Sequence, residues 1–201
     1  HLGNLPESIS YFEETKQWAD EGSADLALYA ASLYRSGQCL WLLGFPDQAQ
    51  TRGSRALTLM QNAAHRELCQ TFCHYAKILY YCREITLLHQ VAQEQVALAI
   101  KQGDSYKLLA GRIFEGWSLA QSGAPSAGFA LVQTNFELML HKANMGWMFA
   151  PMWFGMLGEA ALAANEIETA LQAVARGIAY SNETMNRYWL AYLLQLSGDL
   201  A

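Results

Sequence analysis

The chain has 201 residues, 52% of them hydrophobic and 15% charged, with a formal net charge of -5 at pH 7. This length and apolar content are enough for one folded domain and exclude a disordered chain. The 13 basic residues are scattered, no run of about 20 apolar residues occurs, and the first residues lack the order of a signal peptide. We therefore expect a cytoplasmic protein that binds neither nucleic acid nor a membrane.

The predicted elements are all helices, because no period-2 apolar run bounded by turn residues occurs. In chain order we expect helices over residues 6–21, 25–43, 46–61, 66–82, 84–101, 106–121, 125–142, 150–164, 166–180 and 186–197. Pro6, Pro46 and Pro125 fall in first turns, where a fixed φ and a missing N–H are tolerated. The short connections predict antiparallel neighbours.

A repeat is visible in the short breaks between pairs of helices. Successive breaks fall 39 to 42 residues apart, at Leu2-Gly3, Leu43-Gly44, Cys82-Arg83, Ser122-Gly123 and Ala164-Asn165. Seven residues before a break stand Gly37, Ala76, Gly116 and Gly158. Five residues after a break stand Ser8, Ala49, Leu88, Gly128 and Ala170. Small residues at such positions allow two helix backbones to approach closely, which predicts a helical hairpin in each unit, with Leu88 as the exception.

The pairing of small residues resembles tetratricopeptide repeats, which have Leu-Gly in the first helix and Ala early in the second. The matches are Leu157-Gly158 with Ala170, Gly37 with Ala49, and Gly116 with Gly128. The resemblance implies an all-α, right-handed superhelical solenoid of antiparallel helix pairs, over residues 1–201 as a single domain. Because the chain opens at a loop and closes just after a first helix, we expect it to be a piece of a larger protein.

A closer resemblance is to the helical region of bacterial multidomain signalling proteins that join a predicted ATPase to a nucleotide cyclase or a DNA-binding regulator. It is carried by LWLLGFPDQA at residues 40–49, GWSLA at 116–120 and YWLA at 188–191. None of these segments is catalytic in that family, so the resemblance implies a regulatory role in signal transduction. The breaks at Cys82-Arg83 and Ala164-Asn165 depart from the Leu-Gly pattern.

In tetratricopeptide arrays the first helices line a concave groove that receives a peptide. The resemblance therefore implies partner-binding positions at Tyr34, Gln38, Trp41, Lys77, Tyr80, Trp117 and Glu159, with Cys73, Ile113 and Gly155 beside them. Aromatic side chains there would anchor a partner and amide groups would bond to its backbone. The alternative for each aromatic residue is packing between helices.

Residues 145–156 form the most unusual segment, because aromatic rings and flexible thioethers are concentrated in it. Its candidate pocket residues are Trp147, Met148, Phe149, Met152 and Trp153. An apolar pocket here would make the chain a small-molecule sensor. In the alternative interpretation, Trp153, Phe154 and Leu157 belong to the core and 147–149 fill a gap between repeats.

No sequence motif of a nucleophile, zinc protease or nucleotide site occurs, so we predict no catalytic residue and no cofactor. His65, Cys69 and Cys73 are spaced along one helix, an arrangement that favours packed thiols over a metal site. The low charged fraction indicates apolar surface that meets a partner. The leading hypothesis is thus a non-catalytic module that binds a protein, a peptide or a neighbouring domain; a structural spacer or homo-oligomer interface is a further alternative.

Overall fold

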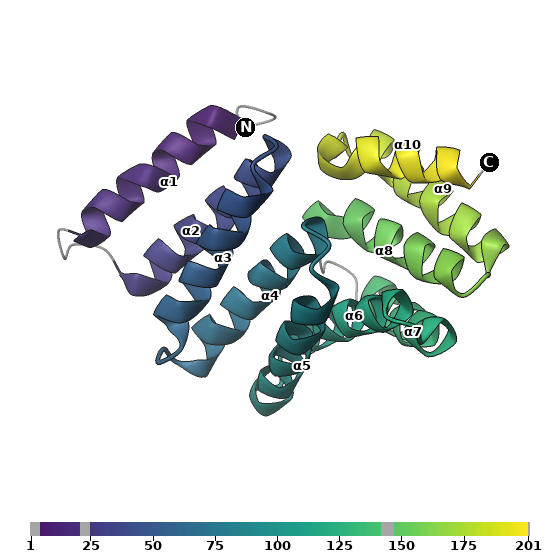
Figure 1. Ribbon diagram of the computed structural model, residues 1–201, viewed down its shortest axis with the longest axis horizontal. Coiled ribbons are helices and arrows are strands. Elements are labelled where there is room, and N and C mark those ends of the chain that lie inside the picture. Colours follow the sequence, from purple (N-terminus) through teal and green to yellow (C-terminus); the bar gives the residue numbers. More distant parts are fainter. Residues whose placement is uncertain (1–4, 21–24, 142–146, 201) are drawn as a thin grey trace. The chain divides into compact units, whose positions relative to one another are not determined.

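A computed structural model describes residues 5–20, 25–141 and 147–200 (Figure 1). The α-helices are α1 (Leu5–Asp20), α2 (Leu26–Leu42), α3 (Pro46–Met60), α4 (His65–Tyr81), α5 (Ile85–Gln102), α6 (Ser105–Gln121), α7 (Pro125–His141), α8 (Ala150–Ala163), α9 (Ile167–Glu183) and α10 (Leu190–Asp199). Two 3-10 turns, η1 (Trp147–Phe149) and η2 (Arg187–Trp189), precede α8 and α10. No strand occurs in these described ranges, which confirms the all-α prediction. The last α-helix begins four residues later than expected, because η2 occupies the start of the predicted segment.

The chain folds as two compact units, unit 1 over residues 1–108 and unit 2 over 109–201. In unit 1, α2 packs against α3 and α4 against α5, while α2 and α4 also contact each other. In unit 2, α8 packs against α9, and α10 contacts both. Neighbouring first helices thus lie beside each other, the arrangement expected of stacked helical hairpins.

The breaks after the first helices share one backbone conformation. Gly44 and Gly123 have φ of 87° and 102°, and Arg83 and Asn165 take the same left-handed region with φ of 61° and 63°. The N–H of Gly44 bonds to the carbonyl of Trp41, and that of Phe45 bonds to Leu40. This is the Schellman arrangement, in which a left-handed residue lets the last carbonyls of a helix find donors.

The third and fifth breaks therefore differ from the Leu-Gly pattern in residue type, and their backbone conformation is unchanged. The N–H of Arg83 bonds to Tyr80 and that of Glu84 to Leu79, which repeats the pattern at Gly44. At the fifth break Asn165 bonds to Leu162 in the same way. The same turn recurs with glycine, arginine or asparagine at its left-handed position.

Small residues bring the two helices of a pair together as predicted. A methyl group added at Gly128 of α7 would lie 2.3 Å from the backbone nitrogen of Ala120 in α6. One added at Gly37 of α2 would lie 3.0 Å from the carbonyl oxygen of Ala49 in α3. Contacts this short leave no room for a Cβ without a backbone shift.

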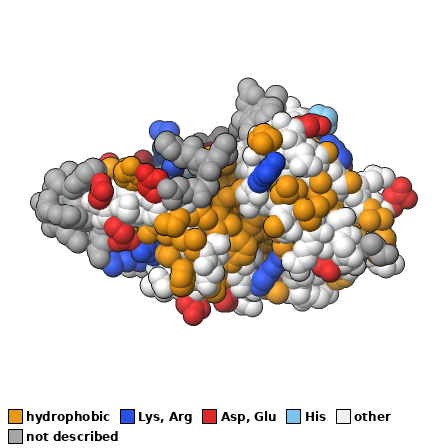
Figure 2. Space-filling model, turned by 90° about the horizontal axis from the view of Figure 1, so that it is seen from above, with side chains coloured by type: hydrophobic (Ala, Val, Ile, Leu, Met, Phe, Trp, Pro, Cys, Tyr) orange, Lys and Arg blue, Asp and Glu red, His pale blue; other side chains and the backbone are white. Residues whose placement is uncertain are grey.

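The core of each unit is apolar, with the thiols of Cys69 and Cys73 buried in unit 1. Burial raises the pKa of Cys69 to about 11, so this thiol is protonated at neutral pH. No described helix has the length and apolar character needed to cross a membrane. Figure 2 shows hydrophobic side chains gathered over the face it presents, with charged side chains scattered among them.

Candidate functional site

The first helices of unit 1 join two predicted groove residues to a histidine that the sequence did not single out as a groove residue. The ring of Tyr34 on α2 stacks on that of His74 on α4, with centroids 4.1 Å apart and planes 4° apart. The amide nitrogen of Gln38 lies 3.3 Å from His74 Nδ1, and that of Gln70 lies 2.7 Å from Nε2. We call Tyr34, Gln38, Gln70 and His74 the histidine cluster.

His74 is held in its neutral form by its surroundings. Burial lowers its pKa well below the ordinary 6.5, and the positive charges of Lys77, Arg35 and Lys107 lower it further. A neutral imidazole has one N–H and one lone pair. Only one of the two ring nitrogens can therefore accept a hydrogen bond from a glutamine amide, and which one depends on the tautomer. The ring is fixed between the two amides as long as it stays neutral.

The side chains of Lys77 and Tyr80 are buried, whereas a residue that lines a groove has to be exposed to its partner. The Lys77 side chain is 1% exposed, and burial lowers its pKa below 10.5. Tyr80 is fully buried, with the Arg83 guanidinium 5.0 Å from its ring centroid. Trp41 is half-buried and lies 4.9 Å from the ring of Tyr81. These side chains form the base of the first-helix face, so a partner would meet their neighbours first.

A hollow with a volume of about 350 Å³ lies beside the histidine cluster in unit 1. It is lined by Ala27, Tyr34, Met60, Arg66, Glu67, Gln70, Thr71 and Lys107. Arg66 is exposed at the first turn of α4, and its side chain lines the hollow. We call this cavity the first-helix hollow. Sequence reasoning missed Arg66 and Gln70, although Gln70 lies one helical turn before His74 on the same face.

Lys107 enters the hollow with its charge already paired. Its ammonium donates to Asp104 Oδ2 at 2.6 Å, and its backbone N–H donates to Oδ1 at 3.0 Å. Burial alone would raise the pKa of Asp104, but these hydrogen bonds and the charge of Lys107 lower it below 3.8. The pair caps the first turn of α6 and fixes the ammonium at the edge of the hollow.

In unit 2 the predicted residues Trp117 and Glu159 meet directly. The indole N–H of Trp117 on α6 donates to Glu159 Oε2 on α8 at 2.7 Å. The hydroxyl of Tyr192 on α10, which the sequence analysis did not identify, donates to the other carboxylate oxygen. One half-buried carboxylate thus links three first helices. Trp117 itself is buried, so its main contact is internal.

The aromatic segment divides between core and surface. Met152 and Trp153 are buried, and the Trp153 ring lies 5.1 Å from that of Phe114. Met148 is 69% exposed, and its carbonyl accepts a hydrogen bond from the Asn186 amide. Residues 145 and 146 and the Trp147 side chain lie outside the described part of the chain. Phe149 is half-buried.

Together, the stacked hairpins and the repeated left-handed breaks define an all-α repeat fold of the tetratricopeptide type. Two solved structures with this fold are a kinesin light chain-like protein of Podospora anserina with nearly identical TPR-like repeats and its Q17M variant. Against the first, the TM-score is 0.54 at 13% identity, over 84% of this chain and 87% of that one. Against the variant, the TM-score is 0.56 at 13% identity, over 88% and 90%. At this identity the likeness is one of fold, and it confirms the predicted solenoid.

No protein-family model matches the sequence, and no curated protein is similar to it at a significant level.

Proposed function

We propose that this chain is a non-catalytic interaction module that binds a segment of another protein on its first helices. The observation that carries the proposal is the first-helix hollow. It offers an aromatic ring from Tyr34, amide groups from Gln70 and an exposed guanidinium from Arg66 beside the apolar side chain of Met60. Aromatic rings, amides and arginines are typical of peptide-binding surfaces.

The histidine cluster supports the same proposal by making the hollow rigid. Tyr34 is stacked on His74, and Gln70 is bonded to the same ring. Side chains that are already ordered lose less entropy when a partner binds. A partner segment would therefore meet preformed hydrogen-bonding groups on this face.

The setting we propose is a cytoplasmic signal-transduction protein, in which the partner is another domain or another polypeptide. The support for this setting is the resemblance of residues 40–49, 116–120 and 188–191 to helical regions of bacterial multidomain regulators. A small-molecule sensor at residues 147–153 is less well supported, because Met152 and Trp153 are buried in the core of unit 2.

Site-specific photo-cross-linking in cells tests the location of the site. A photoreactive amino acid is placed at Arg66 or Gln70 in the hollow, and at the exposed Glu94 of α5 as a control. We expect one protein to cross-link from positions 66 and 70 and not from 94. Cross-linking from 94 alone would move the site to the second helices. Lys77 and Trp117 are unsuitable probes, because both are buried and their replacement would disturb the core.

A further inference from the structure

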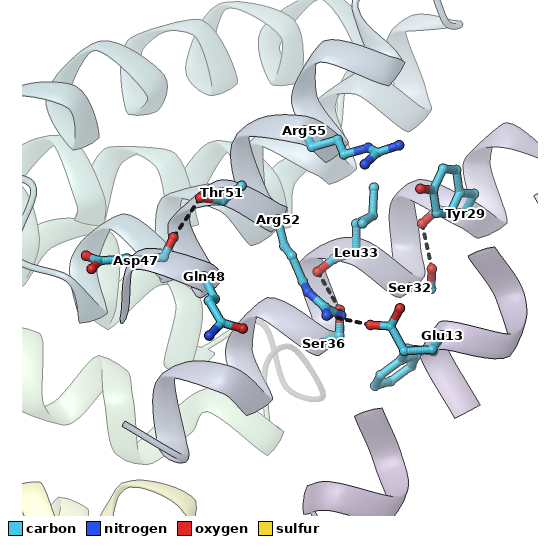
Figure 3. A pocket seen from close by; sticks show the side chains of 11 residues that line it. Glu13, Tyr29, Ser32, Leu33, Ser36, Asp47, Gln48, Thr51, Arg52 and Arg55 are labelled. Carbon is cyan, nitrogen blue, oxygen red and sulfur yellow. Dashed lines mark hydrogen bonds and ion pairs between the residues drawn. The ribbon is translucent and has the colours of Figure 1, made fainter. Parts of the chain in front are cut away.

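A second cavity of about 350 Å³ lies in unit 1 between α1 and α3, with α2 as its floor (Figure 3). Tyr29, Ser32 and Ser36 of α2 form the floor, and Glu13 of α1 faces Arg52 of α3 across it. It uses a different face of α2 from the first-helix hollow, because Ser36 follows Tyr34 by two residues, about 200° around a helix. We call it the inter-helix cavity.

The repeat explains why this position is hollow. Ser32 and Ser36 occupy the same places in their repeat as Thr71 and Tyr75 in the next one, 39 residues later. Tyr75 fills its place completely, since a methyl group added at Gly53 would lie 2.5 Å from its ring. Serine removes the volume of such a ring and leaves a hydroxyl in its place. The cavity is therefore polar because of the sequence of α2.

A guanidinium is held at the centre of the inter-helix cavity. Arg52 donates to Ser36 Oγ at 2.8 Å, and its other terminal nitrogen lies 2.5 Å from Glu13 Oε1. The Ser36 hydroxyl in turn donates to the Leu33 carbonyl, which leaves its lone pairs for the arginine. The Glu13 side chain is 44% exposed and that of Arg52 is 24% exposed. Glu13 is thus the partner that can leave the pair at a lower cost.

Further donors face this cavity without acceptors. Tyr29 is 4% exposed, and its hydroxyl has no hydrogen-bond partner among the described residues. The exposed guanidinium of Arg55 lies 5.8 Å from the centroid of the Tyr29 ring. Figure 3 shows both groups at one side of the cavity, while the carboxylate of Asp47 points away from them. A buried hydroxyl without a partner is costly, so an acceptor from a ligand would be favoured here.

We propose that the inter-helix cavity binds an acidic segment of a partner polypeptide through two carboxylates. One carboxylate replaces Glu13 on the Arg52 guanidinium, whose planar fork of N–H donors suits a carboxylate. The second accepts hydrogen bonds from Tyr29 and Arg55. Glu13 is an internal competitor that occupies the arginine when the segment is absent. This site does not depend on the first-helix hollow, so each can fail its test without the other.

Fluorescence anisotropy on the full chain tests the proposal with a labelled heptapeptide that has a run of central glutamates. The matched probe carries glutamines at the same positions. We expect wild type to bind the glutamate peptide at least about tenfold more tightly than the glutamine peptide, because each carboxylate gains a charged hydrogen bond. Equal binding of the two peptides, or binding of neither, would overturn the proposal.

Three substitutions separate this site from general electrostatic attraction. Glu13→Gln should tighten binding by about threefold, because the competitor for Arg52 loses its charge. Arg55→Gln should weaken binding by about fivefold, since Arg55 is exposed and its replacement leaves the fold intact. Arg176→Gln is the control, because Arg176 also lies over an aromatic ring, 5.3 Å from the centroid of Phe154, but in unit 2. An equal effect of Arg55→Gln and Arg176→Gln would show that only net charge matters and would reject the site.

Arg52→Lys tests the central contact while keeping the positive charge. We expect about a tenfold loss of affinity for the glutamate peptide, because an ammonium cannot bind a carboxylate and Ser36 with the geometry of a guanidinium. Circular dichroism before each titration verifies that the variants are helical.

Competition by inorganic phosphate tests whether the cavity binds a free anion instead of a peptide. If phosphate displaces the peptide at a lower concentration than the unlabelled glutamate peptide does, the site binds a free anion and the proposed partner is wrong.

Discussion

The helix pairs α4/α5 in unit 1 and α6/α7 in unit 2 meet through residues of very different size at the same repeat positions. In unit 2, Gly116 faces Gly128, and the two backbones are so close that an added methyl group would overlap backbone atoms. In unit 1 the same positions hold Ala76 and Leu88, and both are fully buried. The repeat thus permits either backbone contact or a buried side chain. The separation of each pair is set by its own two residues.

The two units also differ in the polar groups that join their first helices. The histidine cluster of unit 1 depends on a neutral ring between two amides. In unit 2 the carboxylate of Glu159 accepts from Trp117 and Tyr192. A neutral ring offers one donor and one acceptor, whereas a carboxylate offers two oxygens as acceptors. The two units therefore join their first helices through different hydrogen-bonding groups.

The largest expected effect comes from emptying the α4/α5 contact. Leu88→Ala removes a fully buried side chain, and we expect the free energy of unfolding to fall by about 3 kcal/mol, from lost transfer energy and the cavity that remains. Urea denaturation measures the change. Leu171→Ala, at an exposed position of α9, is the control and should stay within about 0.5 kcal/mol of wild type. If Leu88→Ala lowered the free energy of unfolding as little as the control does, Leu88 would not be the residue that separates α4 from α5.

The opposite change tests the glycine contact of unit 2. Gly128→Ala should lower the free energy of unfolding by about 2 kcal/mol, because the new methyl group meets the backbone of α6. Gly158→Ala is the matched comparison, since its methyl group would lie 2.8 Å from a Val174 side-chain carbon that can move. There the helix propensity of alanine offsets part of the cost, and we expect a change below about 1 kcal/mol. Equal destabilisation of the two variants would contradict the distinction between backbone and side-chain contact.

The helix pairs and their register could be predicted from the sequence, because the fold depends on spacing that the small residues make visible. What the sequence could not show is that Arg83 and Asn165 adopt the same left-handed region of backbone conformation as Gly44. A left-handed residue other than glycine costs roughly 1 kcal/mol, which packing of the flanking helices can offset. Residue identity alone therefore could not resolve these two breaks.

The third expected effect concerns the histidine cluster and pH. The pKa of His74 is lowered in the folded state by burial and by nearby positive charges, while an unfolded chain has the ordinary value of 6.5. The unfolded state thus binds a proton first, so stability is full above pH 6.5 and falls as the pH drops below it, by at most about 1.4 kcal/mol per unit. Urea denaturation between pH 7.5 and 5.5 measures this slope. We expect His74→Gln to flatten it, and an unchanged slope would show that the cluster does not set the pH response.

The sequence predicted which helix face contains the candidate site, but it did not predict how deeply each residue of the site is buried. The resemblance placed Tyr34 and Gln38 on the face that contains the histidine cluster, where they meet His74. It gave no measure of burial, and Lys77 lies in the core. The third member of the Glu159 arrangement, Tyr192, follows it by 33 residues on another helix. Such a pairing depends on the stacking of repeats, which a short-range pattern does not contain.

The smallest effect sharpens the comparison between breaks with and without glycine. Met185, after α9 in unit 2, has φ of 55° and an exposed side chain, so its replacement removes few contacts. Met185→Gly should raise the free energy of unfolding by about 0.5 kcal/mol, because the relief of left-handed strain exceeds the added flexibility of the unfolded chain. Asn165→Gly should change it less, since asparagine tolerates this conformation better than methionine. Thermal melts of both variants compare the two positions. A larger gain at Asn165 than at Met185 would show that packing around each break, and not side-chain strain, sets its stability.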